Sequence, residues 1–155
     1  MAMEIERKYL VTGDRWRDQV KHSQRMRQAY LSVDPQRCIR VRVAGQHAHI
    51  NLKSSADGIH RHEYQYPIPV EDALAIMQKM CRGHLIDKTR HEIPGDGVLW
   101  EVDEFHGDNQ GLIVAEVELS DAAQHFDKPD WLGREVSDDP RVYNMNLSLN
   151  PFSEW

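Results

Sequence analysis

Alternate residues at the start of the chain carry two carboxylates and an ammonium, Glu4, Glu6 and Lys8. Later segments repeat this alternation, with charged or polar residues at Arg40 and Arg42; His49, Asn51 and Lys53; Arg61, Glu63 and Gln65; Lys88, Arg90 and Glu92; Glu101 and Asp103; and Glu116 and Glu118. A period of two predicts β-strands, each with one charged face and one mostly apolar face. The chemistry of the charged faces is therefore the first question that the sequence raises.

These residue types indicate a site for a metal-bound polyphosphate. Carboxylates suit hard divalent cations, whereas arginine and lysine bind phosphate oxygens as a planar fork or as a point charge. Mg²⁺ fits such a site because it takes one or two carboxylates together with substrate phosphates and keeps several waters. The sequence contains no P-loop pattern, so a nucleotide would not be held by that device.

Strands must position these side chains. Period-two segments bounded by glycine, proline or aspartate predict eight strands, at residues 4–10, 25–32, 37–44, 47–54, 58–68, 86–93, 98–105 and 112–119. An ordinary sandwich would turn the charged faces to solvent, whereas a closed antiparallel barrel with its apolar faces outward would line a lumen with them. The charged faces hold arginine and lysine in blocks and no serine or threonine, which favours the barrel.

Amphipathic helices are expected to pack on the outside of this barrel. A short helix should follow Thr12, and a clearer one should cover residues 71–80. A third is expected to begin at Ser120, a favourable N-cap residue, and a fourth to lie within 140–147. No repeat or linker divides the sequence, so we expect a single α+β, mainly β domain over residues 1–155.

Charge and composition narrow the class of protein. The net charge of −6 argues against nucleic acid as a partner, because nucleic-acid-binding proteins normally carry a basic surplus. Cys38 and Cys81 lack the paired spacing of a zinc site, which indicates free thiols in a reducing compartment. No apolar run reaches the length of a membrane span. We therefore expect a cytoplasmic protein that does not enter a membrane.

The ordered set of charged alternations, together with the stretches KTRHEIP, WEVDEF, LIVAEVEL and PDWLGREVSDDPRVYN, resembles the CYTH family, also called triphosphate tunnel metalloenzymes. The resemblance covers the whole chain and is closest to the short bacterial branch, whose members are similar to inorganic tripolyphosphatases. It implies an eight-stranded antiparallel tunnel. It also implies hydrolysis of tripolyphosphate, or of a nucleoside or thiamine triphosphate, with Mg²⁺ or Mn²⁺.

The resemblance further implies roles for individual residues. The phosphate chain would be bound by Lys8, Arg40, Arg42, Lys53, Lys88 and Arg90, with help from Arg61. Metal would be held by Glu4, Glu6, Glu116 and Glu118, with Asp103 nearby and with Glu63 joining a second metal and the attacking water. Tyr30 matches a tyrosine that acts with the lysine at the position of Lys8. The expected catalytic residues are therefore Lys8, Tyr30 and Glu63.

Two further expectations concern chemistry and departures from the family pattern. In a strongly cationic pocket the pKa of Lys8 would fall, since like charges disfavour its protonated form, and Tyr30 would then orient or activate water. Gln65 stands where relatives often carry a carboxylate, and Ala29 stands where a glycine is common. Gln65 would lower the metal affinity at one site or change the choice of metal.

Some residues have no clear role in this scheme. Four histidines, His47, His49, His60 and His62, are best interpreted as residues flanking turns, although a His-x-His pair can bind zinc. Arg7 lies in the outward phase of the first strand and its partner is not evident from the sequence.

Alternative functions stay open. A class IV adenylate cyclase or a thiamine triphosphatase would use the same phosphate-binding residues, but would need a wall that recognises the base or the thiazole ring. A non-catalytic protein that binds polyphosphate or a triphosphorylated end is disfavoured, because binding an anion gains nothing from so many carboxylates. Composition does not fix the oligomeric state, and a homodimer stays open.

Overall fold

The computed structural model describes residues 3–57 and 59–155. Its strands are β1 (Met3–Val11), β2 (His22–Asp34), β3 (Arg37–Ala44), β4 (His47–Asp57), β5 (His60–Ile68), β6 (Arg82–Pro94), β7 (Leu99–Phe105), β8 (Ile113–Glu118) and β9 (Leu132–Glu135). Its helices are α1 (Val70–Met80), α2 (Asn144–Leu147) and the short 3-10 turns η1 (Arg15–Gln19), η2 (Gly107–Asn109), η3 (Pro140–Val142) and η4 (Phe152–Glu154). All eight predicted strands form, although Gly58, the expected start of the fifth, lies outside the described residues.

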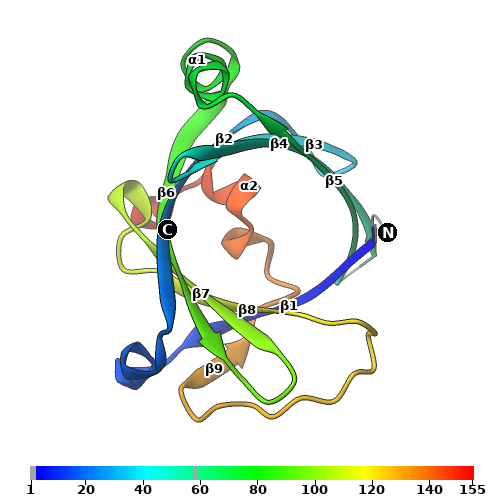
Figure 1. Ribbon diagram of the computed structural model, residues 1–155, viewed down its shortest axis with the longest axis vertical. Helices are drawn as coiled ribbons and strands as arrows, with labels where there is room; N and C mark the ends of the chain where they lie inside the picture. The colour runs from blue at the N-terminus through cyan, green and yellow to red at the C-terminus, as the bar shows by residue number, and fades with distance from the viewer. Residues whose placement is uncertain (1–2, 58) are drawn as a thin grey trace.

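The strands close into an antiparallel barrel (Figure 1). Their order around the barrel is β5-β4-β3-β2-β6-β7-β8-β1, and β1 pairs back to β5. The closing ladder is short, since residues 3–5 of β1 pair with residues 60–62 of β5, whereas residues 6–10 pair with β8. The barrel prediction is thus confirmed, and the sandwich alternative is wrong.

The ninth strand, β9, is not apparent from the sequence. It pairs with the end of β1 at Tyr9 and Val11, beyond the residues that pair with β5. On this outer surface Arg7 Nη1 donates to Glu135 Oε2 of β9 at 2.9 Å. The outward residue that lacked a partner in the sequence therefore ties β1 to β9.

The helices agree with the predictions in part. Helix α1 forms where expected and packs Ala73 against Val41 and Val43 on the outer face of β3. The helix expected at Ser120 does not form, because the Gln124 side chain accepts hydrogen bonds from the backbone N–H and the hydroxyl of Ser120, at 2.8 and 2.9 Å, and closes a turn instead. No helix in the described part of the chain is long and apolar enough to span a membrane.

The main apolar core lies outside the barrel wall. Tyr9 and Trp100, which alternate with charged inward residues, pack with Trp16 of η1 and with Trp131 just before β9. The rings of Trp100 and Trp131 meet edge to face with centroids 5.8 Å apart. Apolar outer faces and charged inner faces therefore agree with the two-residue period of the sequence.

The C-terminal segment is an exception to the expectation that helices cover the outside. In the view down the barrel, α2 lies within the ring of strands (Figure 1). Val142 of η3 and Leu147 of α2 pack in one cluster with Tyr30 and Ile86, which belong to the inward phase of their strands. The segment thus closes one end of the lumen with apolar side chains.

Candidate active site

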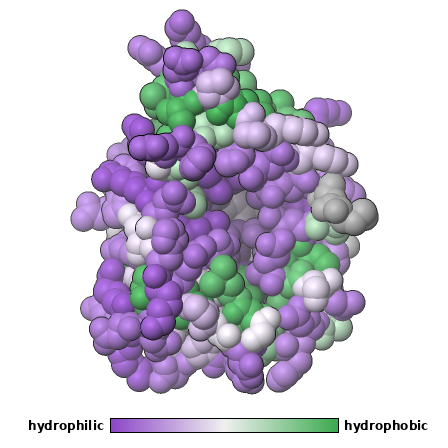
Figure 2. All heavy atoms as spheres, in the orientation of Figure 1, coloured by the Kyte–Doolittle hydropathy of each residue, from purple (hydrophilic) through white to green (hydrophobic). Residues whose placement is uncertain are grey.

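A cavity of about 460 Å³ occupies the lumen. Figure 2 shows the face hollowed near its centre, with mostly hydrophilic residues around the hollow. The cavity is lined by every residue assigned above to phosphate, metal or catalysis except Asp103, which lies fully buried behind it. The barrel therefore gathers side chains that are spread over more than 110 positions of the chain, from Glu4 to Glu118.

The lining is divided by charge into two contiguous groups of strands. The acidic half consists of β7, β8, β1 and β5, which supply the lining carboxylates Glu101, Glu116, Glu118, Glu4, Glu6 and Glu63. The basic half consists of β4, β3, β2 and β6; its cations Lys53, Arg40, Arg42, Lys88 and Arg90 come from β4, β3 and β6, whereas β2 supplies Tyr30. Two cations, Lys8 and Arg61, stand within the acidic half.

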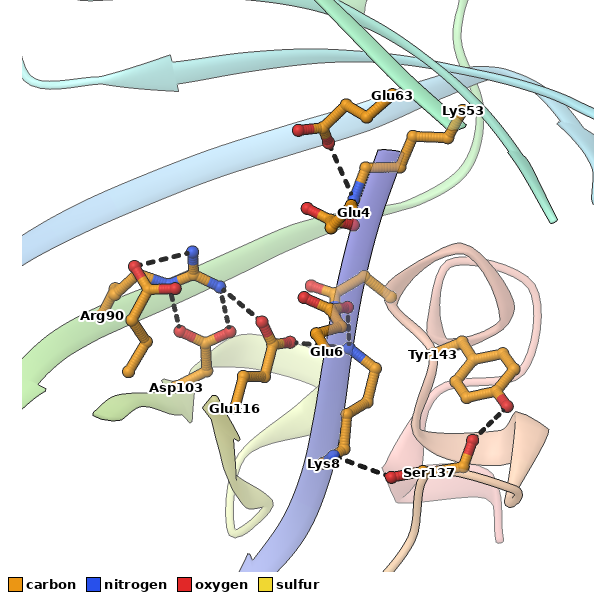
Figure 3. Close-up of polar contacts among 12 residues, drawn as sticks. Glu4, Glu6, Lys8, Lys53, Glu63, Arg90, Asp103, Glu116, Ser137 and Tyr143 are labelled. Carbon is orange, nitrogen blue, oxygen red and sulfur yellow. Dashed lines mark hydrogen bonds and ion pairs between the residues drawn. The ribbon is translucent and has the colours of Figure 1, made fainter. Parts of the chain in front are cut away.

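Lys8 is bound by carboxylates of the acidic half (Figure 3). Its Nζ donates to Glu6 Oε1 and to Glu116 Oε1, each at 2.8 Å. The cross-strand register sets this contact, because Lys8 on β1 stands directly opposite Glu116 on β8. Its backbone N–H donates to Ser137 Oγ, so the segment after β9 also anchors this residue.

These contacts correct the expectation for Lys8. Burial by itself would lower the pKa of the ammonium, but Glu116 and Glu6 raise it above its ordinary value. The prediction of a lowered pKa is therefore wrong. It assumed cationic neighbours, whereas the neighbours that the barrel brings to Lys8 are carboxylates.

The acidic half carries more negative charge than its cations neutralise. Burial, followed by the neighbouring Glu6, raises the pKa of Glu4 to about 7 even though Lys53 opposes the shift. Burial and Glu6 likewise raise the pKa of Glu118. Burial would raise the pKa of Glu116 too, but Lys8 and the adjacent cations hold it well below its usual range.

Ion pairs mark both borders between the halves. At one border Lys53 Nζ of β4 lies 3.0 Å from Glu63 Oε2 of β5 and 3.4 Å from Glu4 Oε1 of β1 (Figure 3). These contacts bridge the short closing ladder between β1 and β5. Lys53 therefore helps to close the barrel as well as to line it.

At the other border Asp103 of β7 binds two cations of β6. Lys88 Nζ lies 2.7 Å from Asp103 Oδ2, and Arg90 binds both carboxylate oxygens at 2.8 and 2.9 Å. Arg90 also reaches Glu116 Oε2 at 3.3 Å. Both oxygens of Asp103 are thus occupied by protein cations, and the residue is fully buried.

The basic half holds its charges close together. Burial, with Arg90 and Arg42 beside it, lowers the pKa of Lys88 to about 7 although Asp103 opposes the shift. Burial, then Arg40 and Arg90, lowers the pKa of Arg42 to about 9. Arg40 is only 6% exposed, and its Nε has no hydrogen-bond partner among the described residues.

Tyr30 belongs to the basic half rather than to the surroundings of Lys8. Its hydroxyl accepts a hydrogen bond from Gln28 Nε2 at 3.2 Å and faces Arg40 and Arg42. Burial raises the pKa of this phenol. The hydroxyl therefore stays protonated near neutral pH and is suited to donating a hydrogen bond.

The histidines do not form one group. His47 and His49 pair with Ala44 and Arg42 at one end of β4, whereas His62 pairs with Ser54 near the other end of that strand. Gln65 lines the cavity and its Oε1 accepts from Asn51 Nδ2 at 2.8 Å. The side chain of Gln65 is therefore tied to a neutral amide.

Several lining residues are not predicted from the sequence. Glu101 belongs to a quoted alternation but receives no role there, and Tyr143 and Asn144 come from the closing segment. Behind the lining, Gln28 bonds to Arg42 and Tyr30. The inward phase of β2 places Gln28 beside Tyr30, whereas nothing in the sequence brings residues 143 and 144 into the lumen.

The donor set fits a divalent cation, although the carboxylates do not converge in the arrangement described. Over residues 3–57 and 59–155, no group of three or more His, Cys, Asp or Glu side chains is placed to hold a metal. Lys8 Nζ lies between Glu6 and Glu116. Burial and then the neighbouring Glu6 raise the pKa values of Glu4 and Glu118, and a hard cation beside these carboxylates would favour their charged forms.

Comparisons with known proteins agree with this geometry. The CYTH domain family matches residues 2–143. An inorganic triphosphatase of Acetivibrio thermocellus is 43% identical over 155 residues, which is 100% of this chain and 99% of that protein. An inorganic triphosphatase of Nitrosomonas europaea is 37% identical over 152 residues, covering 95% of this chain and 97% of that protein.

Solved structures show the same fold. The crystal structure of an inorganic triphosphatase has a TM-score of 0.68 and 34% identity, covering 96% of this chain and 96% of that chain. A putative adenylate cyclase from Bacillus halodurans has a TM-score of 0.55 and 15% identity, covering 78% of this chain and 83% of that chain. At that identity the second likeness concerns the fold alone.

Proposed function

The chain belongs to the CYTH domain family, and on this premise we propose that it is a divalent-metal-dependent hydrolase of inorganic tripolyphosphate or a related triphosphate. The observation that carries the proposal is the division of one lumen into an acidic and a basic half. A metal-bound triphosphate would supply a positive charge to the acidic half, through the metal, and negative charge to the basic half, through the phosphates. The two relatives named inorganic triphosphatase align with nearly the whole chain, which supports the same substrate class here.

The basic half is proposed to bind the phosphate chain. Arg40, Arg42, Lys88 and Arg90 surround one side of the cavity, with Lys53 and Arg61 at its margin and Lys8 across from them. Phosphoryl transfer needs little covalent chemistry from the protein, so catalysis rests on positioning and on neutralising charge. Guanidinium groups suit this task because they bind phosphate oxygens in pairs.

The acidic half is proposed to hold the metal. Triphosphatases of this family are generally metal-dependent, and we propose Mg²⁺ or Mn²⁺, bound by Glu4, Glu6, Glu116 and Glu118 with Glu63 beside them. When bound, the metal would neutralise phosphate charge and favour ionisation of a coordinated water. Asp103 receives a different role, because Lys88 and Arg90 occupy both of its oxygens. It keeps these two cations in position.

Hydrolysis adds water to the terminal phosphorus, breaks one phosphoanhydride bond and releases orthophosphate and pyrophosphate from tripolyphosphate. We assign the proton of the attacking water to a carboxylate of the acidic half, with Glu63 as the proposed acceptor. Lys8, held as an ammonium by Glu6 and Glu116, would orient these carboxylates and contact a phosphate oxygen. Tyr30 would donate its hydroxyl proton in a hydrogen bond to the phosphate chain from the basic half.

A panel of substrates tests the proposal. Phosphate release from tripolyphosphate, ATP, thiamine triphosphate and long-chain polyphosphate is measured with Mg²⁺, with Mn²⁺ and with EDTA, and cyclic AMP is assayed on the ATP samples. We expect metal-dependent release that is fastest with tripolyphosphate. Cyclic AMP formation would favour a cyclase instead, and binding without turnover of any substrate would favour a non-catalytic protein.

A further inference from the structure

A fully buried amide lies at the centre of the basic half. Gln28 of β2 is 0% exposed and stands directly opposite Arg42 of β3 in the sheet. Its Oε1 accepts from Arg42 Nε at 2.8 Å. Its Nε2 donates to Tyr30 Oη at 3.2 Å and to Asn144 Oδ1 at 3.1 Å. The amide thus uses its acceptor for a cation and its donors for two oxygens.

Asn144 extends this network to a second cation. Its Oδ1 accepts from Lys88 Nζ at 3.0 Å as well as from Gln28. Arg42, Gln28, Asn144 and Lys88 therefore form a continuous series of hydrogen bonds that joins β3, β2, α2 and β6. The segment that closes the lumen is connected through this series to two cations that face the cavity.

The neutral charge of these amides distinguishes the basic half from the acidic half. Lys8 in the acidic half and Lys53 at the border between the halves are each held by two carboxylates, which offset their charge. Arg42 is instead held by Gln28, and Lys88 has one carboxylate and one amide. An amide oxygen orients a cation through a hydrogen bond without neutralising it, so the positive charge stays available for an anion.

We propose that Gln28 and Asn144 are positioning residues that orient Arg42 and Lys88 toward the phosphate chain without placing further negative charge beside them. This inference rests on the proposed function, since it takes a triphosphate as the ligand of the basic half. The amide is needed at position 28 because it must both accept and donate. A carboxylate there would accept from Arg42 but could not donate to Tyr30 and Asn144, and a leucine could do neither.

Charge-changing variants of nearly unchanged shape test this role. Gln28→Glu and Asn144→Asp each replace an amide by a carboxylate, and Gln28→Met removes the hydrogen bonds without adding charge. The matched control is Asn109→Asp, a buried asparagine outside the lumen whose Oδ1 accepts from Phe152 N and whose Nδ2 has no partner among the described residues. Thermal melting of all variants reports whether the fold is kept.

Calorimetric titration with tripolyphosphate in EDTA measures binding without metal. We expect roughly tenfold weaker binding or more for Gln28→Glu and for Asn144→Asp, since a like charge is placed against the ligand. With Mg²⁺ the same variants should raise KM more than they lower kcat. Gln28→Met should weaken binding less than Gln28→Glu, and Asn109→Asp should stay within about twofold of the wild type.

The outcomes separate this inference from the proposed function. Wild-type protein that neither binds nor hydrolyses tripolyphosphate would overturn the proposed function itself. If the wild-type protein is active and a folded Gln28→Glu or Asn144→Asp variant binds tripolyphosphate as tightly as the wild type does, only the role of the amides would be overturned. If Gln28→Glu does not fold, Asn144→Asp decides the question, because Asn144 lies at the cavity surface and its substitution needs no repacking of the wall.

Discussion

The two halves of the lumen differ in the partners that surround their buried charges. In the acidic half, carboxylates crowd one another around Lys8, and burial together with the neighbouring Glu6 raises the pKa of Glu4 to about 7. In the basic half, Arg42 and Lys88 have amide partners, and burial with Arg40 and Arg90 nearby lowers the pKa of Arg42 to about 9. Each half is incompletely neutralised by itself. A lumen with these two arrangements suits a ligand that carries both charges.

The borders between the halves differ from their interiors. There Lys53 bonds to Glu63, and Lys88 and Arg90 bond to Asp103, so opposite charges are matched at short range. Such buried pairs contribute modest net stability, because desolvation offsets most of the attraction, yet breaking one partner is costly. The borders therefore keep the barrel in register, whereas the interiors keep charge available for ligands.

The largest expected effect comes from removing the residue that joins the halves. Glu116→Ala takes away one of the two carboxylates bound to Lys8 and one of the three carboxylate partners of Arg90. We expect kcat for tripolyphosphate to fall roughly a thousandfold or more, since a proposed metal ligand and the alignment of two cations are lost together. Phosphate release measures this loss, and circular dichroism checks the fold. Turnover close to that of the wild type would refute the metal assignment.

A smaller effect on activity is expected from replacing Arg40, whose Nε has no hydrogen-bond partner among the described residues. Arg40→Gln removes positive charge from the basic half, so KM for tripolyphosphate should rise roughly tenfold. Because Arg40 Nε has no described partner and Arg42 lies beside it, the melting temperature should stay the same or rise. Steady-state kinetics and thermal melting measure the two quantities. A large drop in melting temperature would mean that Arg40 stabilises the barrel instead.

The acidic half should give the metal-free protein a characteristic pH dependence. Because the pKa of Glu4 is raised from 4.5 unfolded to about 7 folded, the folded state binds more protons between these values. Stability should therefore fall as pH rises from about 5 to about 8, and Glu4→Gln should reduce this slope. Melting in EDTA across this range measures it. An identical slope in Glu4→Gln would show that Glu4 is not the group responsible.

The smallest effect is expected outside both halves. Glu104 on the outer wall binds Arg17 through both oxygens, at 2.9 and 3.1 Å, and also meets His91 Nε2 at 3.0 Å. These partly exposed pairs should make Glu104→Gln cost about 1 kcal/mol or less in unfolding free energy. KM for tripolyphosphate should not change. A marked rise in KM would mean that outer charges also act on the substrate.

The sequence predicts the fold well where the pattern is periodic and charged. Alternation in the first eight strands sets which face is inward, and the resemblance to the CYTH family then picks out nearly all the proposed site residues among the inward ones. The environment of Lys8 could not be predicted, because its partner Glu116 is fixed by which strands are neighbours in the closed barrel. Alternation along one strand carries no such information.

The neutral residues of the site, and those in its irregular segment, could not be predicted from the sequence for a different reason. Gln28 and Asn144 carry no charge, so they do not contribute to the alternation that marks the lumen. Asn144 lies in a short helix whose place depends on apolar contacts of Val142 and Leu147 with the inside of the barrel. Tertiary packing, rather than local sequence, brings this segment into the site.

Separate titrations of metal and of tripolyphosphate test the division of the lumen most directly. Wild type, Glu4→Gln and Arg40→Gln are titrated calorimetrically with Mg²⁺ alone and with tripolyphosphate in EDTA. We predict that Glu4→Gln weakens Mg²⁺ binding roughly tenfold and leaves tripolyphosphate binding unchanged or tighter, and that Arg40→Gln weakens only tripolyphosphate. Equal weakening of both ligands by each variant would contradict a lumen with separate metal and phosphate halves.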